Sequence, residues 1–145
     1  MLLYLDNCCY NRPYDDQSQL KINLETQAKL YIQKLIIDNR LQLASSFMLL
    51  SENDANPHEN RRRFIRTFIE SYTHTFVSIE RLELIKEMAI PIMRTGIKCA
   101  DAYHLACAIL AHSDYFLTTD KRILKFVTDK MIIQNPMLFL SEIEE

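Results

Sequence analysis

Short apolar runs alternate with longer segments of helical periodicity along this chain. The short runs are bounded by polar or turn-forming residues and predict five buried strands, at residues 2–5, 41–44, 76–79, 114–118 and 131–134. Apolar residues at helical intervals predict helices at residues 24–39, 46–52, 61–72, 80–90, 100–112 and 120–127. Residues 91–96 are expected to prolong a helix up to a turn at Gly96, and the chain after residue 134 is expected to be an acidic tail.

Strands that alternate with helices are typical of a parallel sheet covered on both faces. The 145 residues suit one hydrophobic core, so we expect a single domain over residues 1–145. In sheets of this kind the functional crevice lies at the carboxyl ends of the strands. Two acids occupy such positions, because Asp6 directly follows the first predicted strand and Asp120 follows the fourth.

Composition and charge limit the functions that this protein could have. The net charge is −2, so any nucleic-acid binding needs a local basic patch, and the one glycine argues against a glycine-rich phosphate loop. No apolar run approaches the ~20 residues of a membrane span. The start of the chain lacks a basic leader, so we expect a cytoplasmic protein. The four cysteines, two of them adjacent, show no zinc-ligand spacing.

Three segments carry acidic residues at positions where they could bind a metal ion or take part in catalysis. The first ends a strand at Asp6, the second places Asp101 in the first turn of an apolar helix, and the third leads from a strand into the Thr-Thr-Asp of residues 118–120. A buried carboxylate must be paired, hydrogen-bonded or bound to a cation. Each acid alone also fits a helix cap or a favourable contact with a helix dipole. Their combination and order therefore carry the inference.

In that combination and order, the segments closely resemble the PIN-domain nucleases, a family that includes the VapC-like toxins of toxin–antitoxin pairs. In the family an aspartate ends the first strand, another opens a helix, and the next strand leads into Thr-x-Asp. Here Asp6, Asp101 and residues 118–120 match these features. The family also carries a middle acid, usually a glutamate, on the helix after the second strand, and Glu52 matches it. The resemblance covers essentially the whole chain.

The resemblance implies a three-layer α/β/α sandwich with a central, mostly parallel sheet of about five strands. It also implies an endoribonuclease that cuts single-stranded or structured RNA with Mg²⁺ or Mn²⁺. The catalytic residues would be Asp6, Glu52, Asp101 and Asp120, with Asp6, Asp101 and Asp120 as metal ligands. Crowded carboxylates repel one another and need cations to stay ionised, and these ions prefer hard oxygen ligands. Water activated by the metal would attack the phosphorus.

Five residues beside these acids are expected to contact substrate or to support the site: Asn7, Lys98, Thr118, Lys121 and Arg122. The three cations would bind phosphate, which supplies most non-specific affinity for nucleic acids. Thr118 could instead anchor the carboxylate cluster. His104, one turn after Asp101, could be a general base or a core histidine with satisfied hydrogen bonds. Residues 121–125 lack the additional acid that some relatives carry, which argues against a second tightly held metal.

The expected partners are an RNA substrate, a cognate antitoxin protein and, as in many PIN relatives, a second copy of the chain in a homodimer; no membrane association is expected. Two other functions remain open. The chain could be a PIN-like module that binds RNA or protein without cutting, or, ranked last, an aspartate-based phosphotransfer domain. The early Asp-x-Asp expected of aspartyl-phosphate hydrolases is missing, since Asn7 and Cys8 follow Asp6.

Overall fold

Five parallel strands form the centre of the molecule. In the computed structural model, which describes residues 1–144, the strands are β1 (Leu2–Leu5), β2 (Gln42–Ser46), β3 (Thr73–Val77), β4 (Tyr115–Leu117) and β5 (Ile132–Gln134). Their order in the sheet is β3-β2-β1-β4-β5, and every neighbouring pair is parallel. All five predicted strands are present, although β3 begins and ends earlier in the chain than its apolar pattern predicts.

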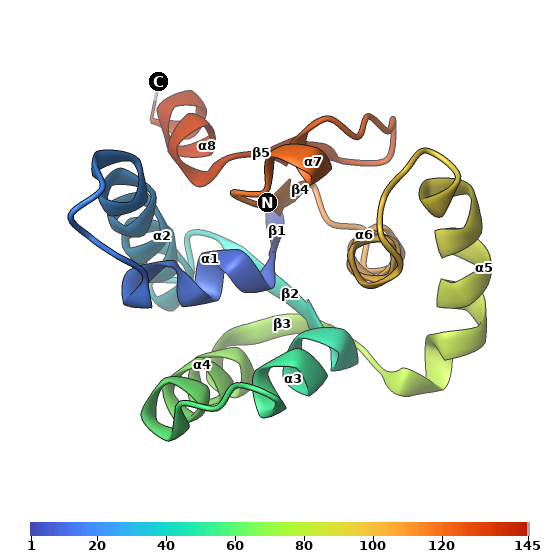
Figure 1. Cartoon of the computed structure of the whole chain (residues 1–145), viewed down its shortest axis with the longest axis horizontal. Coiled ribbons are helices and arrows are strands. Elements are labelled where there is room, and N and C mark those ends of the chain that lie inside the picture. The colour runs from blue at the N-terminus through green and yellow to red at the C-terminus, as the bar shows by residue number, and fades with distance from the viewer. Residues whose placement is uncertain (145) are drawn as a thin grey trace.

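Helices cover both faces of this sheet. The α-helices are α1 (Asn7–Asn11), α2 (Leu20–Ile37), α3 (Phe47–Asp54), α4 (Glu59–Tyr72), α5 (Leu82–Met93), α6 (Cys99–Leu110), α7 (Lys121–Leu124) and α8 (Pro136–Ile143). Short 3-10 helices span Arg12–Tyr14 and Ile79–Arg81. Figure 1 shows α2 and α8 on one side of the sheet and α5 and α6 on the other. The expected α/β/α sandwich is therefore confirmed.

Two helices lie where the sequence pattern predicted none. α1 occupies five residues directly after β1. Residues 136–143, expected to be part of a tail, form α8 instead. The Asn135 side chain caps this helix by accepting a hydrogen bond from the Met137 backbone N–H at 2.9 Å, and Pro136 occupies its first turn. Phe139 is fully buried with its ring 4.8 Å from that of Tyr115, so burial of an apolar face stabilises the helix.

The first strand lies at the middle of the core. Leu3, Tyr4 and Leu5 are completely buried, because β1 has a strand on each side and helices on each face. The Tyr4 ring stacks on Phe116 of β4, with ring centroids 5.3 Å apart. None of the helices in residues 1–144 is long and apolar enough to cross a membrane. The four cysteine thiols are free.

Candidate active site

The four candidate acids all lie near the carboxyl edge of the sheet. Asp6 directly follows β1 and is the N-cap of α1, while Asp120 follows β4 and is the N-cap of α7. Glu52 lies on α3, which follows β2 directly, and Asp101 lies in the first turn of α6. Because β2, β1 and β4 are adjacent and parallel, their following segments meet at one edge.

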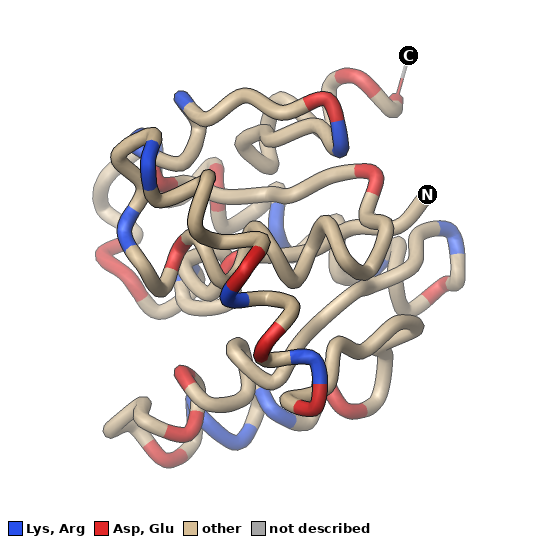
Figure 2. The backbone as a smooth tube through the Cα atoms, turned by 90° about the vertical axis from the view of Figure 1, so that its right-hand side faces the viewer, with Lys and Arg blue, Asp and Glu red and all other residues tan. Residues whose placement is uncertain are grey.

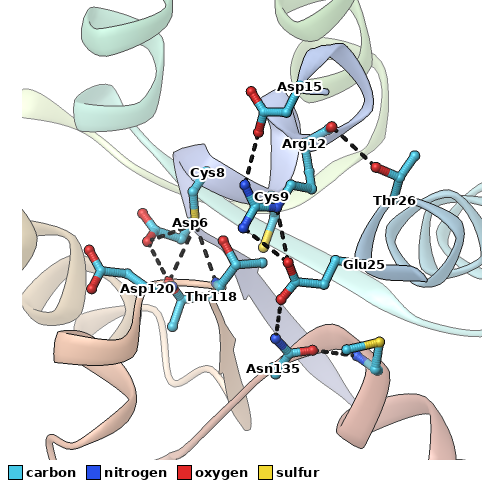
Figure 3. Close-up of polar contacts among 12 residues, drawn as sticks. Asp6, Cys8, Cys9, Arg12, Asp15, Glu25, Thr26, Thr118, Asp120 and Asn135 are labelled. Carbon is cyan, nitrogen blue, oxygen red and sulfur yellow. Dashed lines mark hydrogen bonds and ion pairs between the residues drawn. The ribbon is translucent and has the colours of Figure 1, made fainter. Parts of the chain in front are cut away.

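Asp6 is held in place by hydrogen bonds to both of its carboxylate oxygens. Its Oδ1 accepts from the Asn7 backbone N–H at 2.8 Å, and its Oδ2 accepts from the Thr118 hydroxyl at 2.8 Å. The same Thr118 oxygen accepts from the Asp120 backbone N–H at 3.1 Å. Thr118 thus connects the first and fourth strand ends, and Figure 3 shows Asp6, Thr118 and Asp120 gathered together. Thr118 is fully buried, so its observed contact is the anchoring one.

A thiol completes the immediate surroundings of Asp6. The Cys8 sulfur lies 3.4 Å from Asp6 Oδ2 and 3.4 Å from the Thr118 hydroxyl oxygen. It also accepts a hydrogen bond from the Thr119 backbone N–H at 3.4 Å. The sequence pattern did not single out Cys8 as a site residue, because an isolated thiol beside an aspartate carries no recognised spacing.

Glu52 is held through a separate chain of buried hydrogen bonds. Its Oε1 lies 2.7 Å from His104 Nε2, and His104 Nδ1 lies 2.7 Å from the Tyr4 hydroxyl. The Tyr4 hydroxyl in turn lies 2.7 Å from Ser46 Oγ, which caps α3 by accepting from the Leu49 backbone N–H. His104 is 1% exposed and both of its ring nitrogens have partners. It is therefore a core histidine with satisfied hydrogen bonds, one of which fixes a candidate catalytic acid.

Two of the candidate acids at this edge have raised pKa values, whereas hydrogen bonds lower the pKa of the Cys8 thiol to about 5. Burial raises the pKa of Asp6 from about 3.8 to about 8, and the neighbouring Cys8 adds to the effect, while Thr118 and His104 oppose it. Burial also raises the pKa of Asp101, and repulsion by Asp120 and Glu52 raises it further. The acids thus sense one another's charge. Among residues 1–144, however, no three His, Cys, Asp or Glu side chains are grouped closely enough to hold a metal ion as they stand.

The predicted substrate residues differ in accessibility. Lys98, Lys121 and Arg122 are exposed, the first preceding α6 and the others beginning α7. Asn7 is half-buried, and its Oδ1 accepts a hydrogen bond from Asn11 Nδ2 at 3.2 Å. Figure 2 shows basic and acidic residues interspersed on one side of the molecule, without a broad basic face. Any phosphate contact would therefore come from these few cations beside the acids.

A second buried carboxylate, Glu25 on α2, lies close by but has a cationic partner. Arg12 contacts its Oε1 through Nε at 3.1 Å and Nη2 at 3.0 Å, and Asn135 donates to its Oε2 at 2.5 Å. Arg12 also pairs with Asp15 at 2.9 Å. The two side chains are therefore occupied with each other. Their separation along the chain follows no helical or strand period that could have predicted the contact.

Comparison with known proteins bears on the fold. No protein-family model and no curated protein sequence matches the chain. Among solved structures, the chain is similar to VapBC2 from Rickettsia felis bound to a DNA fragment from their promoter, with a TM-score of 0.61, 14% identity, and coverage of 93% of this chain and 98% of that one. It is also similar to FitAcB from Neisseria gonorrhoeae, with a TM-score of 0.54, 18% identity, and coverage of 94% and 98%. At such identities the likeness shows a shared PIN-like fold over nearly the full length.

Proposed function

We propose that this protein is a metal-dependent endoribonuclease of the PIN type. The observation that carries the proposal is the buried Asp6 carboxylate at the carboxyl edge of the sheet. Among residues 1–144 no lysine or arginine forms an ion pair with it, yet Thr118 holds it beside the segment that carries Asp120. A buried acid without a cationic partner is costly unless it is protonated or a bound cation compensates its charge.

The residues of this edge suit Mg²⁺ or Mn²⁺ in their donor chemistry. Carboxylate oxygens are hard ligands, and such ions bind through few of them while keeping waters. The raised pKa values of Asp6 and Asp101 mark charges that a cation would stabilise. Asp6, Asp101 and Asp120 would hold the ion. When bound, it would neutralise phosphate charge and make water a better nucleophile near neutral pH.

The chain's own groups have distinct tasks in this proposal. Thr118 fixes the orientation of the Asp6 carboxylate. His104 fixes that of Glu52, which can then accept a proton from an attacking water. Lys98, Lys121 and Arg122 would bind the phosphates on either side of the cut, because all three are exposed beside the acids. Asn7 would hydrogen-bond the substrate or a ligand next to Asp6.

The proposal extends to the partners of the protein. The sequence resembles the VapC-like toxins, and the fold is shared with chains of the VapBC2 and FitAcB structures. Both similarities support a toxin that an antitoxin keeps inactive, with an RNA as its substrate. A homodimer is part of the same proposal.

A cleavage assay tests the enzyme activity directly. Purified chain, free of partners, would be incubated with a panel of RNAs in Mg²⁺, in Mn²⁺ and in chelator. We expect metal-dependent cleavage that Asp101→Asn lowers at least about a hundredfold, since even outer-shell changes at metal sites cost 10–100-fold. Asp129→Asn is the matched control, because this exposed aspartate lies just before β5, at the amino edge of the sheet.

The outcome separates the proposal from its alternative. Equal activity in Asp101→Asn and Asp129→Asn would contradict the assignment of the acids. Binding of RNA without any cleavage, in either metal and across the panel, would favour the non-cutting interaction module.

A further inference from the structure

A second surface beside the acids has the chemistry of a nucleotide site. It is a pocket of about 220 Å³ lined by Thr95, Ile97, Arg122, Lys125, Phe126 and Val127. Its lining comes from two segments that are far apart in the sequence. One is the turn between α5 and α6, and the other is α7 with the residues that follow it.

The position of the pocket ties it to the candidate active site. The turn that supplies Ile97 runs directly into the first turn of α6, where Asp101 lies. The helix that supplies Arg122 has Asp120 as its N-cap, and the Asp120 carboxylate accepts from the Arg122 backbone N–H at 2.8 Å. Each segment that lines the pocket therefore adjoins a candidate metal ligand along the chain. A ligand in the pocket would lie next to whatever those acids bind.

The only glycine of the chain shapes one wall. Gly96 has φ of +103°, in the left-handed region that other residues rarely adopt. Its backbone turns the chain from the end of α5 toward α6 and places Ile97 in the pocket lining. The single glycine thus lies in the turn that positions Ile97 near the acids at the carboxyl edge of the sheet.

The pocket combines positive charge with exposed apolar surface. Arg122 and Lys125 are exposed, and neither forms an ion pair with any of residues 1–144. Val127 is 87% exposed and Phe126 is half-buried. Cations that track a phosphate backbone beside apolar and aromatic side chains that contact bases are the means by which proteins bind single strands. The volume is below the roughly 300–1,000 Å³ of small-molecule sites, which suits one base.

We propose that this pocket, named here the 95–127 pocket, binds one unpaired nucleotide of a single-stranded RNA, next to the phosphate that the acids act on. Arg122 and Lys125 contact its phosphate, and the base lies against Ile97, Phe126 and Val127. The inference rests on the proposed nuclease function and deepens it, because it assigns the strand's path past the acids. It also implies that sequence preference arises at a position beside the cut.

Binding measured separately from cleavage tests this inference. A short fluorescently labelled single-stranded RNA of mixed sequence would be titrated with the full chain in chelator, following anisotropy over a range of salt concentrations. We expect the double variant Arg122→Ala, Lys125→Ala to bind about tenfold more weakly, with a salt slope lower by about 1.4, because each lost contact to a single strand removes about 0.7. The matched control is Lys34→Ala, an exposed cation near the end of α2.

The apolar half of the pocket needs its own variant. Phe126 packs against the core, so its removal could unfold the chain. Val127→Ser avoids this problem because the side chain is almost fully exposed. We expect about fourfold weaker binding for each methyl group that the base buries. Leu138→Ser, on the exposed face of α8, is the control for surface hydrophobicity.

The outcomes distinguish this inference from the proposed function. Variants of the pocket that bind and cut RNA like the wild type, while Asp101→Asn is inactive, overturn the pocket and leave the nuclease intact. Weaker binding by both the double variant and Val127→Ser, with both controls unchanged, supports the pocket even if the wild type cuts no RNA. Equal weakening by Lys34→Ala overturns it as non-specific electrostatics, and tighter binding of the matching single-stranded DNA overturns RNA as the occupant.

Discussion

Two buried carboxylates, Asp6 and Glu25, lie in neighbouring parts of the molecule and are treated in opposite ways. Glu25 is fully buried and meets a guanidinium from Arg12 and an amide from Asn135. Asp6 is 6% exposed and meets hydroxyl, thiol and backbone N–H groups, none of them cationic. Figure 3 shows both clusters in one view.

Only one of these two buried acids has a cationic partner among residues 1–144. The charge of Glu25 is neutralised within the chain, so this residue connects α2 to the first and last segments of the fold. Hydrogen bonds hold the Asp6 carboxylate in one orientation, but no lysine or arginine among residues 1–144 neutralises its charge. Burial raises its pKa to about 8. A carboxylate that is held in place but lacks a cation is prepared to receive one. The proposed site therefore rests on the missing counter-charge of Asp6, and not on burial alone.

Breaking the compensated pair should give the largest effect on stability. Arg12→Met leaves the Glu25 carboxylate buried without its cation, and we expect the free energy of unfolding to fall by about 3 kcal/mol, as for other broken buried ion pairs. Urea denaturation followed by circular dichroism measures the loss. The double variant Arg12→Met, Glu25→Gln removes the orphaned charge and should recover part of it. An unchanged midpoint in Arg12→Met would show that the pair is not a clamp.

Substitution of Asp6, the buried acid without a cationic partner, should raise the stability of the protein instead of lowering it. Between an ordinary pKa near 3.8 and the folded-state value of about 8, the unfolded chain has released a proton that folded Asp6 keeps. In the absence of metal, this proton makes the free energy of unfolding fall as pH rises through the window. Cys8, whose pKa is lowered from about 9 to about 5, acts in the opposite direction above pH 5, so the contribution of Asp6 is read from the difference between wild type and Asp6→Asn. Asp6→Asn removes this penalty. We expect the variant to gain roughly 3–6 °C in melting temperature relative to wild type at pH 8, and less at pH 5.

Addition of metal is the control for the prediction about Asp6→Asn. Mn²⁺ added at pH 8 should raise the melting temperature of the wild type but leave that of Asp6→Asn nearly unchanged, because a ligand that binds only the folded state stabilises it. Thermal melts with and without chelator measure both effects. A difference in stability between wild type and Asp6→Asn that stays constant from pH 5 to pH 8 without metal would contradict the raised pKa of Asp6.

Substitution of Asp15, the exposed partner of Arg12, should have the smallest effect on the free energy of unfolding. Asp15 forms an ion pair with the same guanidinium at 2.9 Å, but its side chain is 40% exposed. Pairs of this kind contribute about 0–1 kcal/mol, so Asp15→Ala should lower the free energy of unfolding by no more than about 0.5 kcal/mol. The same urea titration compares it with Arg12→Met. A loss as large as that of Arg12→Met would mean that Asp15, and not Glu25, dominates the contact.

Local patterns predicted the strands, most helices and the placement of the acids, since these depend on periodicity and on nearest neighbours. They did not predict α8, although an Asn-Pro pair before an apolar run is a recognisable helix start. The contacts between distant segments had no such signal. Thr118 reaches Asp6 only because β4 lies beside β1, and Arg12 reaches Glu25 only because the turn after α1 folds back onto α2.

The sheet order also governs when this site comes into existence during translation. β1 lies between β2 and β4, and Asp6 and Thr118 are separated by 112 positions along the chain. A ribosome that adds about 5–20 residues per second makes the threonine roughly 6–22 s after the aspartate. Until then one side of β1 has no neighbouring strand and the carboxylate lacks the hydroxyl that orients it. A nascent or prematurely terminated chain therefore lacks this arrangement of acids, and only a chain translated through Asp120 can acquire it.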